Sequence, residues 1–220
     1  MTIGAEVQLR GITEILHFTT NKGIVGTLAT GALLSRYRLP REEYLQHIVH
    51  VNAADRPEAN EFFDKSENWL DYVNLSISEI NRRYFLVSQK WHIDAGIWWG
   101  ILAFDSEAMA HENVFFTTTN NSYDLCIRNI GLQGLNGLFV PMIRRKSPSW
   151  KVNRSQRSLE LPTCEQAEVL YPGQISIEYL RCIYVLDENC QDIAKGWLRE
   201  FRISDVDVLI SPQKFEGQPN

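Results

Sequence analysis

The sequence predicts a single α+β domain over residues 1–220, with an ordered core at about 10–210. The chain has 220 residues, of which 44% are hydrophobic, and this is enough to bury a core of its own. Segments typical of strands outnumber those typical of helices, and the two kinds do not alternate regularly, which disfavours a doubly wound sheet. The glycine-rich dinucleotide fingerprint and the P-loop are both absent from the sequence.

The strands are predicted from short runs rich in apolar, aromatic and β-branched residues. These runs are residues 12–19, 70–78, 96–104, 113–119, 137–143, 166–171 and 180–186.

Helices are predicted in three places. Residues 21–31 form a helix that ends at a glycine, and a second helix begins after Pro40 with acidic residues in its first turn. Residues 189–201 are amphipathic and predict a helix capped by Asn189. The tail after Ser211 contains proline and glycine and is expected to be frayed.

The charge of the chain is unevenly distributed. The formal net charge of −5 disfavours a general polyanion binder, because the overall field repels nucleic acid. Residues 144–158 are the exception, since they contain basic residues and a tryptophan but no acid. A local basic segment favours a focused contact with phosphates, and the tryptophan is a candidate for base stacking. The predicted nucleic-acid-binding residues are Arg144, Arg145, Lys146, Trp150, Lys151, Arg154 and Arg157.

Metal and disulfide chemistry are not indicated. The four cysteines lack CxxC spacing and a companion histidine pattern. His47 and His50 share a predicted helix face but have no supporting carboxylate pattern, so a metal site there is disfavoured. There is no signal pattern and no apolar run of membrane-spanning length, so a cytoplasmic setting away from membranes is expected.

Three side chains have both a structural and a functional interpretation. Glu168 is either a solvent-facing strand carboxylate or a carboxylate that stabilises developing positive charge in glycosyl transfer. His17 is either a half-buried histidine bonded to a backbone carbonyl or a ligand contact at the end of its strand. Arg56 is either a surface ion-pair partner or a clamp for a diphosphate.

Over about residues 10–201, these motifs resemble the DarT family of DNA ADP-ribosyltransferase toxins, as a divergent branch. The resemblance lies in ILHFTTNKGIVGTLATGALLSR, with its His-x-Thr and GLLS-like turn, in FFTTTNNSY and in QAEVLYPGQISIEYL. DYVNLSIS stands where the family has a more aromatic central strand, which is a departure from its pattern.

The resemblance implies an ADP-ribosyltransferase-like fold, with two small packed β-sheets flanked by helices and an NAD cleft between them. It implies that His17 and Thr19 hold the nicotinamide-ribose end of NAD and that Glu168 is the catalytic glutamate. Arg56 would be the catalytic, NAD-contacting arginine. Residues 144–158 would form the substrate-recognition loop, and no metal would be required.

The implied function is that of an NAD-dependent ADP-ribosyltransferase toxin that modifies nucleobases of single-stranded DNA. The family context implies a toxin–antitoxin or phage-defence system with a DarG-like macrodomain antitoxin. A target base must be unstacked to react, which favours single strands. Three alternatives stay open: RNA or protein as the acceptor, a non-catalytic nucleic-acid-binding module, and a metal-free ribonuclease that uses His17 and Glu168.

Overall fold

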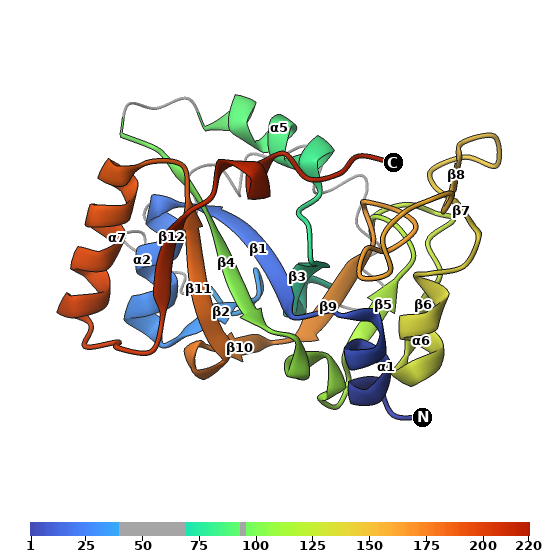
Figure 1. Ribbon diagram of the computed structural model, residues 1–220, viewed down its shortest axis with the longest axis horizontal. Helices are drawn as coiled ribbons and strands as arrows, with labels where there is room; N and C mark the ends of the chain where they lie inside the picture. The colour runs from blue at the N-terminus through green and yellow to red at the C-terminus, as the bar shows by residue number, and fades with distance from the viewer. Residues whose placement is uncertain (40–68, 93–95) are drawn as a thin grey trace.

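The structure is a computed structural model that describes residues 1–39, 69–92 and 96–220 (Figure 1). Its α-helices are α1 (Ile3–Arg10), α2 (Asn21–Thr30), α5 (Arg82–Trp91), α6 (Gly131–Gly137) and α7 (Glu188–Glu200). Its strands are β1 (Glu14–Thr20), β2 (Ala32–Leu34), β3 (Tyr72–Ile77), β4 (Trp99–Asp105), β5 (Phe115–Thr117), β6 (Arg128–Ile130), β7 (Met142–Arg144), β8 (Lys151–Asn153), β9 (Glu168–Pro172), β10 (Gln174–Ser176), β11 (Leu180–Val185) and β12 (Asp207–Ile210).

Eight of these strands form one sheet in the order β12-β11-β4-β1-β3-β9-β5-β6. Strand β3 joins its two halves. The first part of β3 pairs with β9 over Tyr72–Leu75, and its last residues pair with β1 at Ser76 and Ile77. The halves β12-β11-β4-β1 and β9-β5-β6 therefore meet at β3, and they lie on opposite sides of it in Figure 1. The pairs β2–β10 and β7–β8 are separate two-stranded antiparallel sheets, and only β7 and β8 are consecutive in the sequence.

Both faces of the half β12-β11-β4-β1 are covered by helices, so its strand β4 is continuously apolar. Strand β4 is buried from Trp99 to Phe104 and pairs with β1 and β11. Helix α2 contributes Ile24 and Leu28 to the main core on one face. On the other face, Phe85 of α5 packs with Trp99 in a second cluster. This explains why 96–104 is recognisable as a strand although its residues do not alternate.

Three predictions about elements are corrected by the structure. Residues 137–143 form the end of α6 and a buried turn, followed by the start of β7 at Met142, because Leu138 and Phe139 fill the core from a turn. Helix α7 is capped by Asp187, whose carboxylate accepts the Cys190 N–H at 2.8 Å, and not by Asn189.

The segment after Ser211 is ordered against the rest of the protein rather than frayed. A 3-10 turn at Pro212–Phe215 buries Phe215 in the second cluster. The Gln218 N–H then donates to the Glu79 carboxylate at 2.7 Å, and the Asn220 amide donates to the Thr163 carbonyl at 2.6 Å. The predicted helix after Pro40 lies outside the described residues.

Candidate functional site

The first part of the site is the junction of β1 with α2. His17 and Thr19 are two residues apart on β1, so they face the same side of the strand. Thr20 caps α2, and the Thr19 hydroxyl lies against Gly23 so closely that a Cβ at Gly23 would collide with it. The glycine in the first helical turn is therefore needed to let the strand end and the helix start come together.

His17 is held by β3. Its Nδ1 lies 2.9 Å from the backbone carbonyl oxygen of Asn74. A carbonyl can only accept, so Nδ1 carries the proton and Nε2 presents a lone pair. Burial lowers the pKa of His17, and the Asn74 carbonyl opposes this only partly, so the imidazole is neutral at pH 7. The structural interpretation of His17, a backbone-bonded histidine, is correct, and no hydrogen bond to Nε2 is found among the described residues.

Glu168 opens β9, where it is paired with Thr117 of β5. One of its carboxylate oxygens accepts the Asn121 N–H at 2.8 Å, and the Asn74 side chain also hydrogen bonds to the carboxylate. Desolvation by burial is the largest influence and raises the pKa of Glu168 to about 7. The bonds from Asn121 and Asn74 and the charge of Arg128 act in the opposite direction. Glu168 is thus a partly buried carboxyl group poised between its charged and neutral forms, not a solvent-facing strand residue.

Arg128 on β6 supports this carboxylate indirectly. Its Nε donates to the Asn121 side-chain oxygen at 2.6 Å, and its Nη2 donates to the Asn121 carbonyl at 2.5 Å. The arginine therefore fixes Asn121, whose N–H points at Glu168. Because Arg128 binds Asn121 rather than Glu168 itself, it leaves the carboxylate without a direct cationic partner among the described residues.

Asn74 connects the two functional candidates. Its backbone carbonyl accepts a hydrogen bond from His17 Nδ1, and its side chain hydrogen bonds to the Glu168 carboxylate. One residue of β3 therefore contacts both candidate groups. Thr19 follows on the same face of β1. Arg56, the third predicted member of the site, lies outside the described residues.

Sequence analysis missed Asn74, Asn121 and Arg128. Every second residue of β3 is buried, and Asn74 lies on the other, partly buried side, where a polar residue is ordinarily unremarkable. Asn121 lies in the Thr/Asn-rich stretch that the resemblance singled out, so that signal was present.

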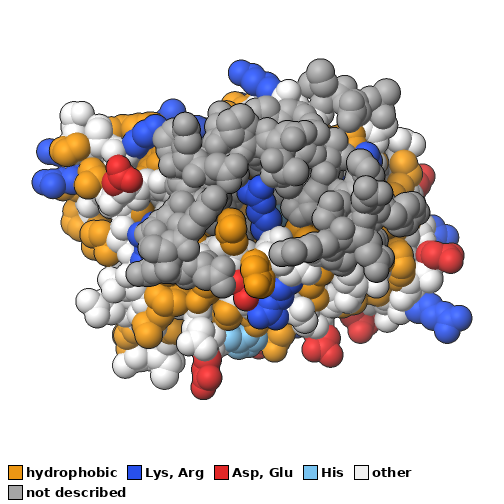
Figure 2. All heavy atoms as spheres, turned by 180° about the vertical axis from the view of Figure 1, so that it is seen from behind, with side chains coloured by type: hydrophobic (Ala, Val, Ile, Leu, Met, Phe, Trp, Pro, Cys, Tyr) orange, Lys and Arg blue, Asp and Glu red, His pale blue; other side chains and the backbone are white. Residues whose placement is uncertain are grey.

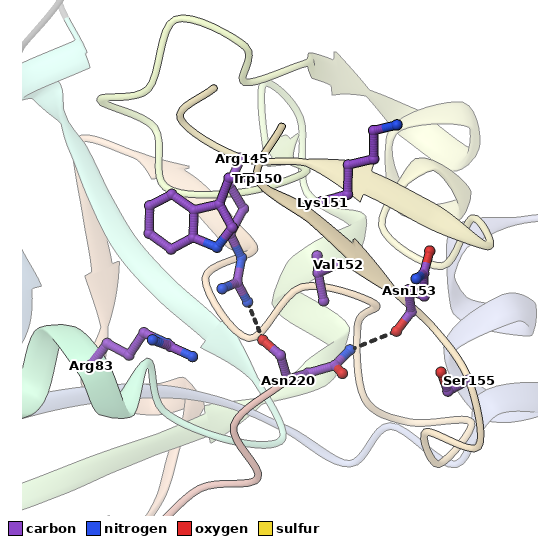
Figure 3. A pocket seen from close by; sticks show the side chains of 8 residues that line it. All are labelled: Arg83, Arg145, Trp150, Lys151, Val152, Asn153, Ser155 and Asn220. Carbon is purple, nitrogen blue, oxygen red and sulfur yellow. Dashed lines mark hydrogen bonds between the residues drawn. The ribbon is translucent and has the colours of Figure 1, made fainter. Parts of the chain in front are cut away.

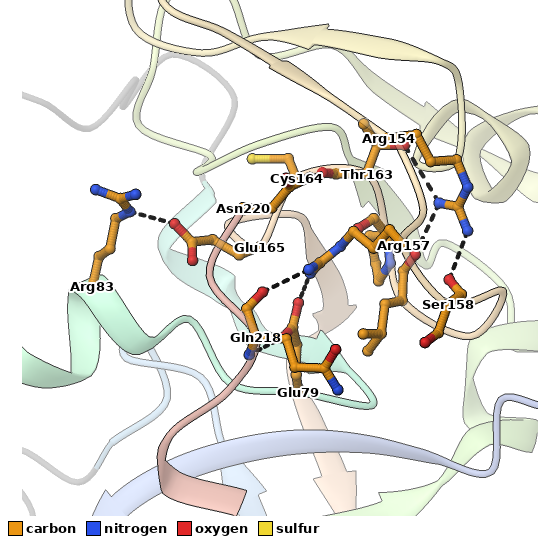
Figure 4. A network of polar contacts seen from close by, with 12 residues as sticks. Glu79, Arg83, Arg154, Arg157, Ser158, Thr163, Cys164, Glu165, Gln218 and Asn220 are labelled. Carbon is orange, nitrogen blue, oxygen red and sulfur yellow. Dashed lines mark hydrogen bonds and ion pairs between the residues drawn. The ribbon is translucent and has the colours of Figure 1, made fainter.

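In the basic segment 144–158, three arginines are bonded within the protein and other basic residues are exposed. Arg157 pairs with the buried Glu79 and donates to the Gln218 carbonyl at 2.6 Å (Figure 4). Arg154 donates to the carbonyl oxygens of Leu161 and Ser158 at 2.9 and 2.8 Å.

Arg145 is also bound within the protein. It is 1% exposed, and it bonds to Glu165, the Asn220 carbonyl and the Cys164 sulfur. The prediction that all the basic residues of this segment face phosphates is therefore corrected for Arg145, Arg154 and Arg157. Their donors are used to fold the loop, because a buried guanidinium must be bonded.

The exposed members of the basic segment are Arg144, Lys146, Trp150 and Lys151. They lie on or beside the β7–β8 hairpin. Figure 2 shows another side of the molecule, on whose described part basic side chains are interspersed with acidic and hydrophobic ones. The charge of the described surface in that view supports the expectation of a local rather than a general contact with nucleic acid.

Comparison with known proteins identifies the family. The family model described as ssDNA thymidine ADP-ribosyltransferase, DarT, matches residues 16–216. The chain belongs to the DarT family. This confirms the resemblance found in the sequence, and the family's described activity agrees with the function predicted there. No curated protein is matched by the sequence.

Solved structures of DarT proteins share the fold. Thermus sp. 2.9 DarT in complex with carba-NAD⁺ superposes with a TM-score of 0.60 at 16% identity, covering 92% of this chain and 97% of that one. Thermus sp. 2.9 DarT in complex with ADP-ribosylated ssDNA gives 0.61 at 15%, covering 93% and 96%. Thermosipho africanus DarTG in complex with ADP-ribose gives 0.59 at 15%, covering 94% of this chain but only 52% of that longer chain. The predicted α+β ADP-ribosyltransferase fold is thus confirmed.

The described residues lack two further features. Among the described residues, no group of three or more histidine, cysteine, aspartate or glutamate side chains is arranged to hold a metal ion. In the same part of the chain, no helix combines the length and the apolar character needed to cross a membrane.

Proposed function

We propose that this chain uses Glu168, His17 and Thr19 to transfer ADP-ribose from NAD to thymidine in single-stranded DNA. The observation that carries the proposal is the double contact of Asn74 on β3, which binds both a neutral imidazole from β1 and a partly buried carboxyl group from β9. Membership of the DarT family supports the reaction and the substrate. The proposal assigns the residue roles, including that of Arg56, which is taken from the family resemblance alone.

The residues present fit NAD as the ADP-ribose donor. NAD supplies a ribose whose bond to nicotinamide breaks with positive charge building on the ribose carbon. An anionic Glu168 beside that carbon stabilises the charge, and its partial burial strengthens the effect because water screens it less. His17 keeps Nδ1 on the Asn74 carbonyl, so Nε2 accepts a hydrogen bond from a ribose hydroxyl.

The acceptor base completes the reaction. A thymine ring nitrogen forms the new bond to the ribose carbon and loses its proton, while nicotinamide leaves with the electron pair of the broken bond. Glu168, with its pKa of about 7, is suited to take that proton once the positive charge has been discharged. The base must leave its stack to reach this position, which favours single-stranded DNA.

The exposed part of the basic segment is proposed to hold the DNA. Arg144, Lys146 and Lys151 contact the phosphate backbone, and Trp150 stacks on a base. Arg145, Arg154 and Arg157 use their donors within the protein. They contribute to DNA binding by fixing the shape of the loop and through the positive electrostatic potential of their charges.

The biological setting is proposed from the family. The DarTG chain is about twice as long as this one and was solved with ADP-ribose. A toxin–antitoxin pair with a DarG-like macrodomain partner, acting in the cytoplasm, fits this relationship. A role in phage defence belongs to the same proposal.

Mass spectrometry of thymidine-containing oligonucleotides, incubated with the protein and NAD, tests the function. The expected result is a mass gain of one ADP-ribose on single-stranded DNA, lost with Glu168→Ala. RNA of the same sequence and a protein acceptor serve as competing substrates. Absence of the adduct from DNA, or an equal yield with Glu168→Ala, contradicts the proposal. Strand scission without NAD would favour the ribonuclease alternative.

A further inference from the structure

An open pocket lies beside the β7–β8 hairpin (Figure 3). It encloses about 330 Å³, and its lining contains three cationic side chains and an aromatic ring but no acidic side chain. The residues that line it are Arg83, Arg145, Trp150, Lys151, Val152, Asn153, Ser155 and Asn220. This combination of cations and an indole is suited to a ligand that carries both a phosphate and a base.

Among the three cationic side chains of the pocket, Arg83 is the one that sequence analysis did not identify. Its Nε is bonded to Glu165, whose side chain is 1% exposed, while the Arg83 side chain itself is 53% exposed. Within the described part of the chain, its two Nη nitrogens have no bonding partner. The side chain points from α5 toward the pocket in Figure 3. Glu165 thus fixes the guanidinium and leaves its fork free for an anion, the geometry that arginine uses to bind phosphate.

Trp150 provides an aromatic surface whose position is fixed from within. The Arg145 guanidinium carbon lies 5.5 Å from the centroid of the indole ring, and the Tyr123 ring is 6.4 Å away. Arg145 is itself held by Glu165 and the Asn220 carbonyl. Trp150 remains 38% exposed, so its ring is available to a ligand, while Arg145 beside it is buried. A preorganised ring loses little freedom on binding.

We propose that this pocket binds one nucleotide next to the modified base, with its base stacked on Trp150 and its phosphate held by Arg83. Lys151 lies at the rim, where it contacts a neighbouring phosphate. The inference rests on the proposed function, because it takes single-stranded DNA as the substrate. Glu165 anchors Arg83 and stands three residues before Glu168 in the sequence, so the pocket and the proposed catalytic carboxylate belong to neighbouring parts of the chain.

The size of the pocket specifies one nucleotide rather than a longer segment. Its 330 Å³ lies at the lower end of the range of small-ligand pockets. An indole can stack only on a base that is free of its own neighbours, so a duplex presents no suitable surface except at its ends. The pocket therefore contributes to the preference for single strands in addition to the requirement of the reaction itself.

Fluorescence anisotropy with a labelled single-stranded oligothymidine, measured without NAD at several salt concentrations, tests the pocket. Trp150→Ala should weaken binding about fivefold or more and leave the salt dependence unchanged, because stacking releases no counterions. Arg83→Gln should also weaken binding and should lower the slope of log affinity against log salt by about 0.7. Lys195→Gln is the matched control, since it removes one exposed charge on α7, at the far end of the molecule (Figure 1).

Two additional variants keep the test independent of folding. Trp150→Phe should recover most of the affinity, and Arg83→Lys retains the charge at Glu165 but should bind more weakly than wild type because it lacks the fork. Thermal melting shows whether each variant is folded. The proposal is overturned if Trp150→Ala and Arg83→Gln bind like Lys195→Gln, or if a blunt duplex of the same length binds as tightly. Mass spectrometry of oligonucleotides incubated with the wild-type protein and NAD tests the proposed function separately from these binding measurements.

Discussion

Replacing Glu168 with glutamine should make the protein more stable at alkaline pH and leave its stability almost unchanged at acidic pH. Burial raises the pKa of this carboxyl from 4.5 to about 7 in the folded protein. A group with a raised folded pKa contributes its stability fully below the unfolded pKa and loses it as the pH rises through the folded pKa. Wild type should therefore lose stability from about pH 4 to pH 8, whereas Glu168→Gln has no proton to lose at this position.

The size of the effect follows from the shift. At 1.36 kcal/mol per pKa unit, the shift to about 7 corresponds to ~3 kcal/mol in the free energy of unfolding. This value is an upper limit, because the side chain is only partly buried and solvent screens part of the penalty, so a difference of about 1–3 kcal/mol is expected. Glutamine keeps an oxygen that can accept the Asn121 N–H, so the substitution tests the charge rather than the hydrogen bond.

Urea denaturation of both proteins at pH 4, 6 and 8 provides the measurement. The difference in unfolding free energy, Glu168→Gln minus wild type, should grow with pH, and Glu165→Gln is a useful comparison at a neighbouring buried, arginine-paired carboxylate. Removing the charge of Glu165 should destabilise the protein instead, because Arg145 is then left without its anion. A difference for Glu168→Gln that is constant with pH, or that falls as pH rises, would refute the assignment of burial as the dominant influence.

The remaining predictions concern activity and the supports of the site. The kcat/KM for NAD should fall as the pH drops below about 7, because Glu168 must be ionised; a profile flat from pH 5 to 8 would contradict this. Gly23→Ala should cost about 1–3 kcal/mol in urea denaturation and raise the KM for NAD, because the added Cβ displaces the Thr19 hydroxyl; wild-type values for both would contradict the role of this contact. Arg157→Ala should cost about 3–5 kcal/mol because it leaves a buried carboxylate unpaired, whereas Arg144→Ala, at an exposed position of the same segment, should change stability by less than about 0.5 kcal/mol. Equal costs for these two variants would show that the segment is not divided as described.

Sequence patterns were sufficient for the elements with strong local signals. The strand at 70–78 and the helix at 21–31 ending in Gly31 are found close to their predicted bounds, because aromatic and β-branched content and a glycine C-cap are local properties. The run 137–143 was misassigned since apolar residues fill a core equally well from a turn. Local composition does not distinguish these cases.

The candidate site could be proposed from the sequence where a motif contains its residues, but not where residues from distant segments complete it. His17 and Glu168 come from recognisable motifs, but the residue that joins them, Asn74, acts through its backbone carbonyl as well as its side chain. The basic segment illustrates the opposite error. All of its arginines were predicted to contact phosphates, whereas Arg157 forms an ion pair with Glu79, 78 residues earlier in the chain. No sequence pattern predicts that pair.

The central claim is that His17 and Glu168 act on the same ribose. A crystal structure of Glu168→Gln with NAD bound tests it most directly, because the substitution slows turnover while preserving the shape of the site. The account predicts His17 Nε2 and the Glu168→Gln amide within about 3.5 Å of the nicotinamide ribose, with His17 Nδ1 still on the Asn74 carbonyl. NAD bound elsewhere, or in contact with only one of these two side chains, would contradict the account.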